Sequence, residues 1–207
     1  MMIAPGTTLV DHIIPARSSK SASLLQDGLL VVGFSIFLAL CAQVSFYLPI
    51  TPVPVTLQTL AVLLTGAALG SRRGALAMLA YLAEGAAGLP VFAGASGGFI
   101  HLIGYTGGYL WSYPIAAFIV GLLCEKGLDR RFLTSALAML PSAIAIDVIG
   151  TAWLAVVLHL DILTALQQGI LPFIPGDLLK LVVATALLPT AWMIVRAVKP
   201  AERRPRA

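Results

Sequence analysis

Residues 56–89 read TLQTLAVLLTGAALGSRRGALAMLAYLAEGAAGL, with SRRG at 71–74 between two apolar runs. Each run is short beside the roughly 20 residues that a helix needs to cross a bilayer core. Two arrangements are therefore open: a pair of short membrane helices, or one re-entrant hairpin. The arginines favour the pair of helices, because at the tip of a hairpin they would remain in mid-membrane. The stretch thus predicts two helices joined at a membrane surface.

The composition of the whole chain indicates a membrane protein. Of its 207 residues, 59% are apolar and only 11% are charged, whereas a soluble domain has about 25% charged residues. We expect an all-α integral membrane protein with six transmembrane helices in a single domain over 27–198, preceded by a tail at 1–26 and followed by a basic tail at 199–207. The apolar runs that predict the helices are 27–48, 56–70, 74–89, 107–124, 132–159 and 177–198.

The distribution of basic residues predicts the orientation of these helices. With six spans, 12 of the 13 basic residues fall on one side, which the positive-inside rule assigns to the cytoplasm. They are Arg17, Lys20, Arg72, Arg73, Lys126, Arg130, Arg131, Arg196, Lys199, Arg203, Arg204 and Arg206. Both termini are therefore expected in the cytoplasm, and the chain is expected in the cytoplasmic membrane as a multi-pass protein. The thirteenth basic residue, Lys180, lies at the outer end of the last run.

The three outer connections differ from the inner ones in composition. Residues 48–56, 88–109 and 166–176 are apolar, rich in proline and glycine, and almost uncharged. Solvent-exposed loops are usually polar, so these segments are expected to fold back over the helices. Proline and glycine suit compact turns. We therefore expect the outer loops to form a lid over a substrate pocket.

Several functions are disfavoured by the absence of their motifs. The chain has no GxxxxGK[ST] phosphate loop, no GxSxG elbow and no HExxH pair, and its two cysteines and three histidines are isolated from one another. The basic residues are scattered between apolar runs and form no extended basic face for nucleic acid. We expect no catalytic residues, no metal and no cofactor.

The stretch FIPGDLLK, Phe173–Lys180, holds the most informative charges. Asp177 and Lys180 lie three residues apart and so share one face of a helix. They could form a simple ion pair, or they could line a pocket in which Asp177 accepts hydrogen bonds from ligand N–H groups and Lys180 donates to a carbonyl or carboxylate. Asp177 also follows Pro175 and Gly176, at or near a helix N-cap, which is compatible with either interpretation.

Other residues carry weaker signals. Glu84 either reaches the membrane interface or lines the pocket, and we assign it to the substrate site. Tyr109 belongs to an aromatic belt or stacks on a bound ring, and we also assign it to the substrate site. Asp147 is expected to make an interhelical hydrogen bond rather than to touch ligand. Ser35 and Ala39 form a small-xxx-small pair that is expected to contact a helix of a partner protein.

Specific motifs resemble those of one family. The segment TPVPVTLQTL, continuing through GLPVFAG and TGGYL to FIPGDLLK, resembles BioY, the biotin-specific substrate-binding component of energy-coupling factor (ECF) vitamin transporters. The resemblance runs from about Ala39 to Leu181. It implies a six-helix membrane protein with an outward-facing pocket, in which Asp177 and Lys180 line the biotin site. Gln58, in PVPVTLQ, is also assigned to the site. GYTGGYL has Tyr105 where the family usually has proline.

The resemblance also implies partners and a function. A membrane-embedded coupling subunit and two cytoplasmic ATPases would drive biotin uptake, with this chain as the substrate-binding component. One alternative is a stand-alone biotin transporter that needs no ATPase partners. Another, from a different class, is a membrane-embedded enzyme that processes lipid. A lipid enzyme is the less expected because it would keep metal ligands or a nucleophile near the interface.

Overall fold

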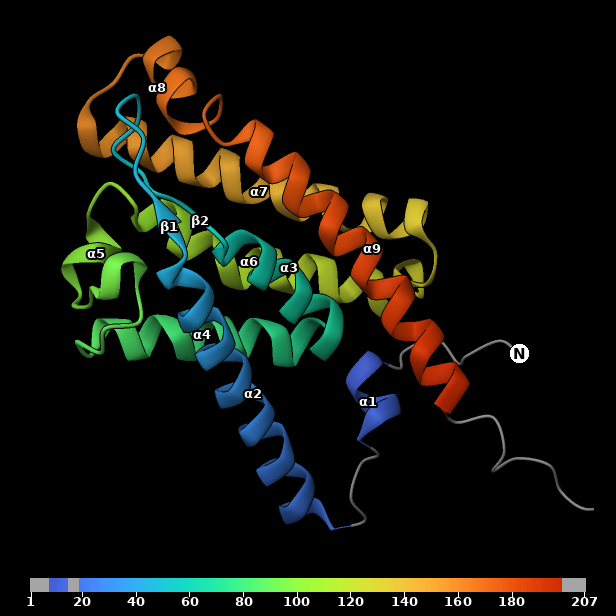
Figure 1. The fold of residues 1–207 in the computed structure, drawn as a ribbon. Helices are drawn as coiled ribbons and strands as arrows, with labels where there is room; N and C mark the ends of the chain where they lie inside the picture. The colour runs from blue at the N-terminus through green and yellow to red at the C-terminus, as the bar shows by residue number, and fades with distance from the viewer. Residues whose placement is uncertain (1–7, 15–18, 199–207) are drawn as a thin grey trace, which may run out of the picture.

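The computed structural model describes residues 8–14 and 19–198, which are predominantly helical (Figure 1). The predicted basic tail at 199–207 lies outside the described residues. The main helices are α2 (Lys20–Gln43), α3 (Gln58–Leu69), α4 (Ser71–Ala86), α6 (Gly107–Glu125), α7 (Phe132–Leu158) and α9 (Ile174–Val198). The shorter elements are α1 (Leu9–Ile13), β1 (Ser45–Phe46), β2 (Val55–Thr56), η1 (Ala93–Ala95), α5 (Ile100–Ile103), η2 (Leu128–Arg130) and α8 (Ile162–Gly169).

Each of the six predicted runs overlaps one of the main helices, but several boundaries differ from those predicted. Helix α2 begins at Lys20 rather than at residue 27, so the last part of the predicted N-terminal tail is helical. Helix α9 begins at Ile174 rather than at residue 177. Within the described residues, α2, α6, α7 and α9 are long and apolar enough to cross a membrane, whereas α3 and α4 are shorter.

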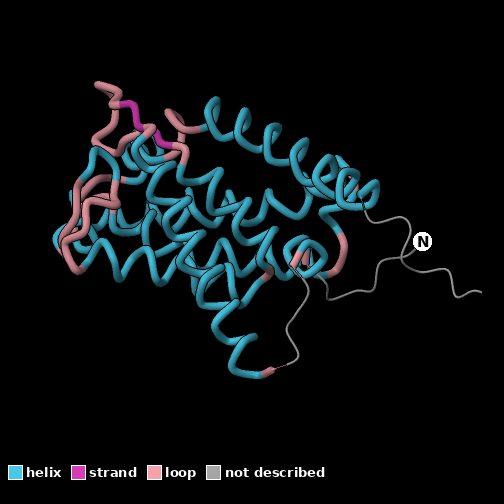
Figure 2. Tube along the Cα trace, turned by 60° about the horizontal axis from the view of Figure 1, so that its bottom comes forward, coloured by secondary structure: helices cyan, strands magenta, loops and turns pink. Residues whose placement is uncertain are grey.

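The helices pack around α6. Helix α6 contacts α3, α4 and α7, while α2 crosses α4 and α9 packs against α7 and α3 (Figure 1). The short β1–β2 hairpin, α5 and α8 lie at one end of the bundle, and α1 and η2 lie toward the other (Figures 1 and 2). We call the first of these the loop end. The three predicted outer connections therefore gather at the same end of the molecule.

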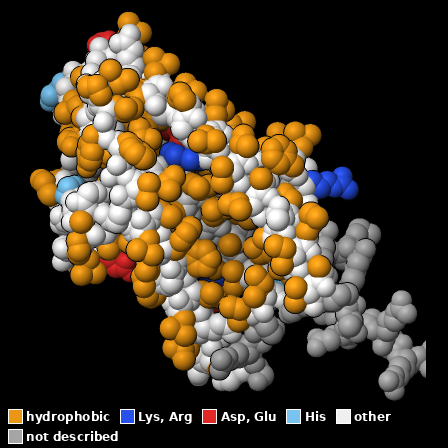
Figure 3. Space-filling model, in the orientation of Figure 1, with side chains coloured by type: hydrophobic (Ala, Val, Ile, Leu, Met, Phe, Trp, Pro, Cys, Tyr) orange, Lys and Arg blue, Asp and Glu red, His pale blue; other side chains and the backbone are white. Residues whose placement is uncertain are grey.

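The surface of the bundle is unusually apolar. Large apolar side chains are exposed along α2, α7 and α9, and hydrophobic side chains are spread over the whole described face in Figure 3. Leu29, Leu133 and Val156, for example, are 66%, 71% and 72% exposed. A surface of this kind is suited to lipid rather than to water, since a soluble monomer exposes only small apolar patches. The structure thus supports a multi-pass membrane protein.

Close approach of α3, α4 and α6 depends on small residues. A Cβ on Gly66 would lie 2.4 Å from the carbonyl oxygen of Ala117, and a Cβ on Gly121 would lie 2.4 Å from the backbone nitrogen of Ser71. Between α3 and α4, Gly70 has a φ of 85°, which favours glycine and lets the chain reverse direction within one residue. This turn carries the two arginines that argued against a re-entrant hairpin.

Arg73 joins several elements at the end of the bundle opposite the loop end. Its guanidinium donates to Asp11 of α1 at 2.6 Å, to Asp27 of α2 at 3.3 Å and to the Leu69 carbonyl of α3 at 3.1 Å. Burial opposes ionisation of Asp11, but hydrogen bonds from Thr8 and Arg73 outweigh it and lower the pKa of this carboxyl. Arg73 therefore anchors α1 to the membrane helices.

Replacing Arg73 with alanine is expected to release α1 from the bundle. The variant loses both ion pairs, each worth at most about 1 kcal/mol where solvent reaches them, so the bundle itself should stay folded. Hydrogen exchange of the amides in 9–14 should become faster, whereas exchange in α6 should not change. Arg72→Ala is the matched control because Arg72 is exposed. Unchanged protection of 9–14 in Arg73→Ala would show that α1 is held by its apolar contacts alone.

Candidate substrate-binding cavity

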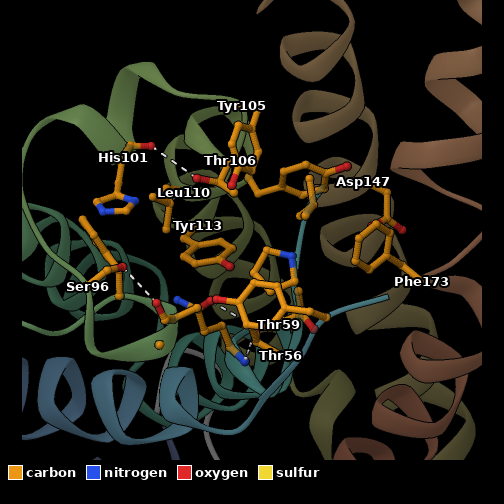
Figure 4. Close-up of a pocket in the computed structure, with 18 of the residues that line it drawn as sticks. Thr56, Thr59, Ser96, His101, Tyr105, Thr106, Leu110, Tyr113, Asp147 and Phe173 are labelled. Atoms are coloured by element: carbon orange, nitrogen blue, oxygen red, sulfur yellow. Dashed lines mark hydrogen bonds between the residues drawn. The ribbon is translucent and has the colours of Figure 1, made fainter. Parts of the chain in front are cut away.

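A cavity of about 230 Å³ opens near the loop end, between the connecting segments and the helices (Figure 4). Aromatic and small polar side chains dominate its lining, with three charged groups among them. The lining residues are Tyr47, Val53, Pro54, Thr56, Gln58, Thr59, Phe92, Ala93, Gly94, Ser96, His101, Tyr105, Thr106, Tyr109, Leu110, Tyr113, Asp147, Phe173, Asp177 and Lys180. All three predicted outer connections contribute to it, as a lid over a pocket requires.

The ion pair predicted from FIPGDLLK lies in this cavity. The ammonium of Lys180 donates to Asp177 Oδ1 at 2.9 Å and to the hydroxyl of Thr59 on α3 at 2.9 Å. Lys180 is 8% exposed, so its charge depends on these partners. Thr59 therefore links α3 to the charged pair on α9, a contact that the linear sequence did not indicate.

Asp177 lies near the start of α9, as expected, but not at the N-cap itself. Because α9 begins at Ile174, Asp177 lies in the first helical turn rather than at the N-cap, and its amide donates to the Phe173 carbonyl at 2.8 Å. A carboxylate in the first turn still interacts favourably with the helix dipole. Asp177 Oδ1 accepts a hydrogen bond from Lys180, so the carboxylate pairs with a cavity residue rather than capping the helix.

Gln58 lines the cavity and also holds the lid segment in place. Its amide nitrogen donates to the hydroxyl of Tyr81 on α4 at 2.6 Å, and its amide oxygen accepts from Thr56 at 3.0 Å. Tyr81 in turn donates to the carbonyl of Val91 at 3.0 Å. This chain of hydrogen bonds connects the start of α3 to the connection between α4 and α5.

Tyr109 contributes its ring to the cavity. Its hydroxyl donates to the Gly169 carbonyl at 2.7 Å, and its ring lies 5.9 Å from that of Phe173. A Cβ on Gly150 of α7 would lie 2.2 Å from the Tyr109 ring, so α7 needs glycine there to admit it. The hydroxyl is thus occupied by the protein, and only the ring is available for stacking on a ligand.

Comparison with known proteins identifies the family. The family model described as "BioY family" matches residues 15–197, which is most of the chain. The chain belongs to the BioY family.

Relatives within the BioY family are similar over most of their length. The biotin transporter BioY of Thermotoga maritima is 43% identical over 141 residues, which cover 68% of this chain and 81% of the relative. The biotin transporter BioY of Rhizobium etli is 36% identical over 178 residues, covering 81% and 94%. The crystal structure of the S-component for biotin from an ECF-type ABC transporter aligns with a TM-score of 0.76 at 24% identity, covering 86% of this chain and 95% of the other. This structural match shows the same helical fold.

The structure places two residues of this BioY chain away from the positions expected from the sequence. Glu84 is not among the cavity-lining residues, because its side chain faces α2 and accepts a hydrogen bond from Ser35 at 2.8 Å. Ser35 is fully buried inside the chain, and Ala39 packs against the core. The small-xxx-small pair therefore packs α2 within this chain, so Ser35 is not exposed to a partner helix.

Asp147, which was expected to lie away from the ligand, is part of the cavity lining. It lines the cavity from α7 and makes no hydrogen bond to another helix among the described residues. His101 and Tyr105 also line it, and neither was assigned to the site from the sequence. Within 8–14 and 19–198, no three His, Cys, Asp or Glu side chains are grouped closely enough to hold a metal ion.

Proposed function

We propose that this chain binds biotin in the cavity and takes it up across the cytoplasmic membrane as the substrate-specific component of an ECF transporter. Biotin has an apolar bicyclic body with a ureido group at one end and a carboxylate at the other. A cavity lined by aromatic rings with a few fixed polar groups suits such a ligand. The names of the relatives from T. maritima and R. etli support biotin as the substrate.

The observation that carries the proposal is the Lys180–Asp177–Thr59 cluster in this cavity. Burying both charges for a weak i, i+3 ion pair gives little net stability, so a purely structural role explains the cluster poorly. A ligand that offers both N–H donors and a carbonyl oxygen would satisfy the carboxylate and the ammonium together. We therefore assign Asp177, Lys180, Gln58 and the Tyr109 ring to the substrate site.

The proposal includes a topology with six membrane spans and cytoplasmic termini. The first turn of α4 bears Arg72 and Arg73, and the α6–α7 connection bears Lys126, Arg130 and Arg131. By the positive-inside rule, we assign both to the cytoplasmic side. The loop end with the cavity then faces outward. A coupling subunit and two ATPases would act from the cytoplasmic side, and this chain would perform no catalysis itself.

Equilibrium binding of radiolabelled biotin to the purified chain in detergent tests the proposal. We expect saturable binding that unlabelled biotin displaces and that lipoate and thiamine do not. Competition by lipoate or thiamine as strong as that by biotin would reject biotin specificity. Absence of binding by monodisperse protein would reject the proposed substrate.

Reconstitution in liposomes separates the remaining alternatives. If the chain alone accumulates biotin against a gradient, it is a stand-alone transporter and the requirement for ATPase partners is wrong. If uptake appears only with a coupling subunit and ATPases, the ECF assignment is supported. Turnover of phospholipid by the purified chain would instead favour the lipid-processing enzyme.

A further inference from the structure

Asp147 is the charged cavity residue for which neither the sequence motifs nor the proposed function has a role. It lies on α7, and Gly150 and Thr151, one turn further along, contact the ring and hydroxyl of Tyr109. This face of α7 is therefore directed toward the cavity. A carboxylate in the middle of a membrane helix is costly and is expected to serve a purpose.

Acidic side chains outnumber basic ones in the cavity lining. Among the described lining residues there are two carboxylates, Asp147 and Asp177, and one ammonium, Lys180. Lys180 is held by Asp177 and Thr59, whereas Asp147 accepts no hydrogen bond from the described residues. Asp147 is near enough to both charges to interact with them electrostatically. This part of the cavity thus holds two carboxyl groups for one ammonium, and the acceptor capacity of the Asp147 carboxyl is unused by the described residues.

The part of the cavity opposite Asp147 is lined by polar side chains without carboxyl groups. Figure 4 shows His101 and Ser96 on one side and Asp147 and Phe173 on the other, with Tyr113 between them. His101 and Ser96 come from the connection between α4 and α6, and they bring an imidazole and a hydroxyl rather than carboxylates. A ligand with an anionic end and an uncharged N–H end would meet less repulsion with its anion on the His101 side.

We propose that Asp147 determines ligand orientation and specificity by accepting a hydrogen bond from one ureido N–H group of biotin, while Asp177 accepts from the other. This inference rests on the proposed function, since it takes biotin as the ligand. Lys180 then donates to the ureido carbonyl oxygen, and the carboxylate of biotin points away from Asp147, toward His101. Asp147 thereby excludes ligands that present an anion to this part of the cavity.

The test compares three ligands on the purified chain and its Asp147→Asn variant. The ligands are biotin, 2-iminobiotin, in which a cationic guanidinium replaces the urea at neutral pH, and biotin methyl ester, which has no carboxylate charge. Because a charged acceptor binds N–H donors more strongly than a neutral one, the variant should bind biotin about tenfold more weakly and 2-iminobiotin about 100-fold more weakly. The preference for biotin over its methyl ester should not change.

Ratios between ligands make the result independent of how much of the variant folds. The matched control is Asp161→Asn, which makes the same change at the exposed N-cap of α8, outside the cavity, where asparagine caps equally well. An unchanged ratio of 2-iminobiotin to biotin affinity in Asp147→Asn would overturn the proposal. So would a selective gain for biotin over its methyl ester, which would place the ligand carboxylate beside Asp147. Failure of the unmodified chain to bind biotin would instead reject the proposed function.

Discussion

Replacing Lys180 with methionine is expected to weaken biotin binding by about 100-fold or more, because the half-buried Asp177 carboxylate loses its cationic partner inside the cavity. The same change leaves a half-buried carboxylate without its cation and should lower the free energy of unfolding by about 1–3 kcal/mol. Asp177→Asn should have a similar effect on binding. Equilibrium binding and denaturant unfolding in detergent measure the two quantities separately.

The double variant Asp177→Asn/Lys180→Met separates a ligand site from a structural ion pair. With both charges removed, no uncompensated charge remains, so most of the lost stability should return. Biotin binding should stay weak, because neither the ammonium nor the carboxylate is present to contact the ligand. Lys126→Met is the control, since Lys126 is exposed at the end of α6. A double variant that binds biotin as tightly as the unmodified chain would show that the pair serves stability alone.

Gly66→Leu is expected to prevent normal packing of α3 on α6. The obstruction is backbone, because even a Cβ at this position would lie 2.4 Å from the Ala117 carbonyl oxygen and 2.9 Å from the Ala117 Cα. Backbone cannot move aside as a side chain can, so the cost should exceed the roughly 1–3 kcal/mol typical of overpacked cores. We expect little monodisperse protein after purification. Any that remains should bind biotin poorly, because α3 carries Gln58 and Thr59 into the cavity.

Gly33→Leu is the matched control for this prediction. Gly33 lies on α2, and a Cβ at this position would have no described neighbour within 4 Å, so a leucine there should be accommodated. Its yield and midpoint of unfolding should stay close to those of the unmodified chain. Equal behaviour of the two variants would show that α3 and α6 can separate without loss of the fold.

Much of the fold was accessible from the sequence because insertion into a bilayer depends on local composition. Each apolar run became a helix, since backbone polar groups in lipid must be satisfied within the segment. The chain reverses direction at Gly70, and SRRG forms the first turn of α4. Helix ends were less accurate: α2 starts before Gln26 and α9 includes Pro175, because polar or turn-forming residues are also tolerated in first helical turns.

The site was predictable only in part. Asp177 and Lys180 could be found because charges in an apolar run are costly, and the structure places both in the cavity. Glu84 and Asp147 carried the same signal, yet one faces α2 and the other lines the cavity. The reason is that these helices are apolar around much of their circumference, so hydrophobic periodicity does not indicate which face is directed inward.

The sequence by itself determined that the chain is a membrane protein, roughly where its helices lie, and that Lys180 is separated from the other basic residues. These features depend on the composition and charge of each segment, which can be read along the chain. Tertiary structure alone decided the rotation of each helix about its axis, and hence that Ser35 meets Glu84, that Thr59 reaches Lys180 and that Asp147 lines the cavity. Those outcomes depend on close packing at glycines such as Gly66, where the fit between surfaces distant in sequence selects one arrangement.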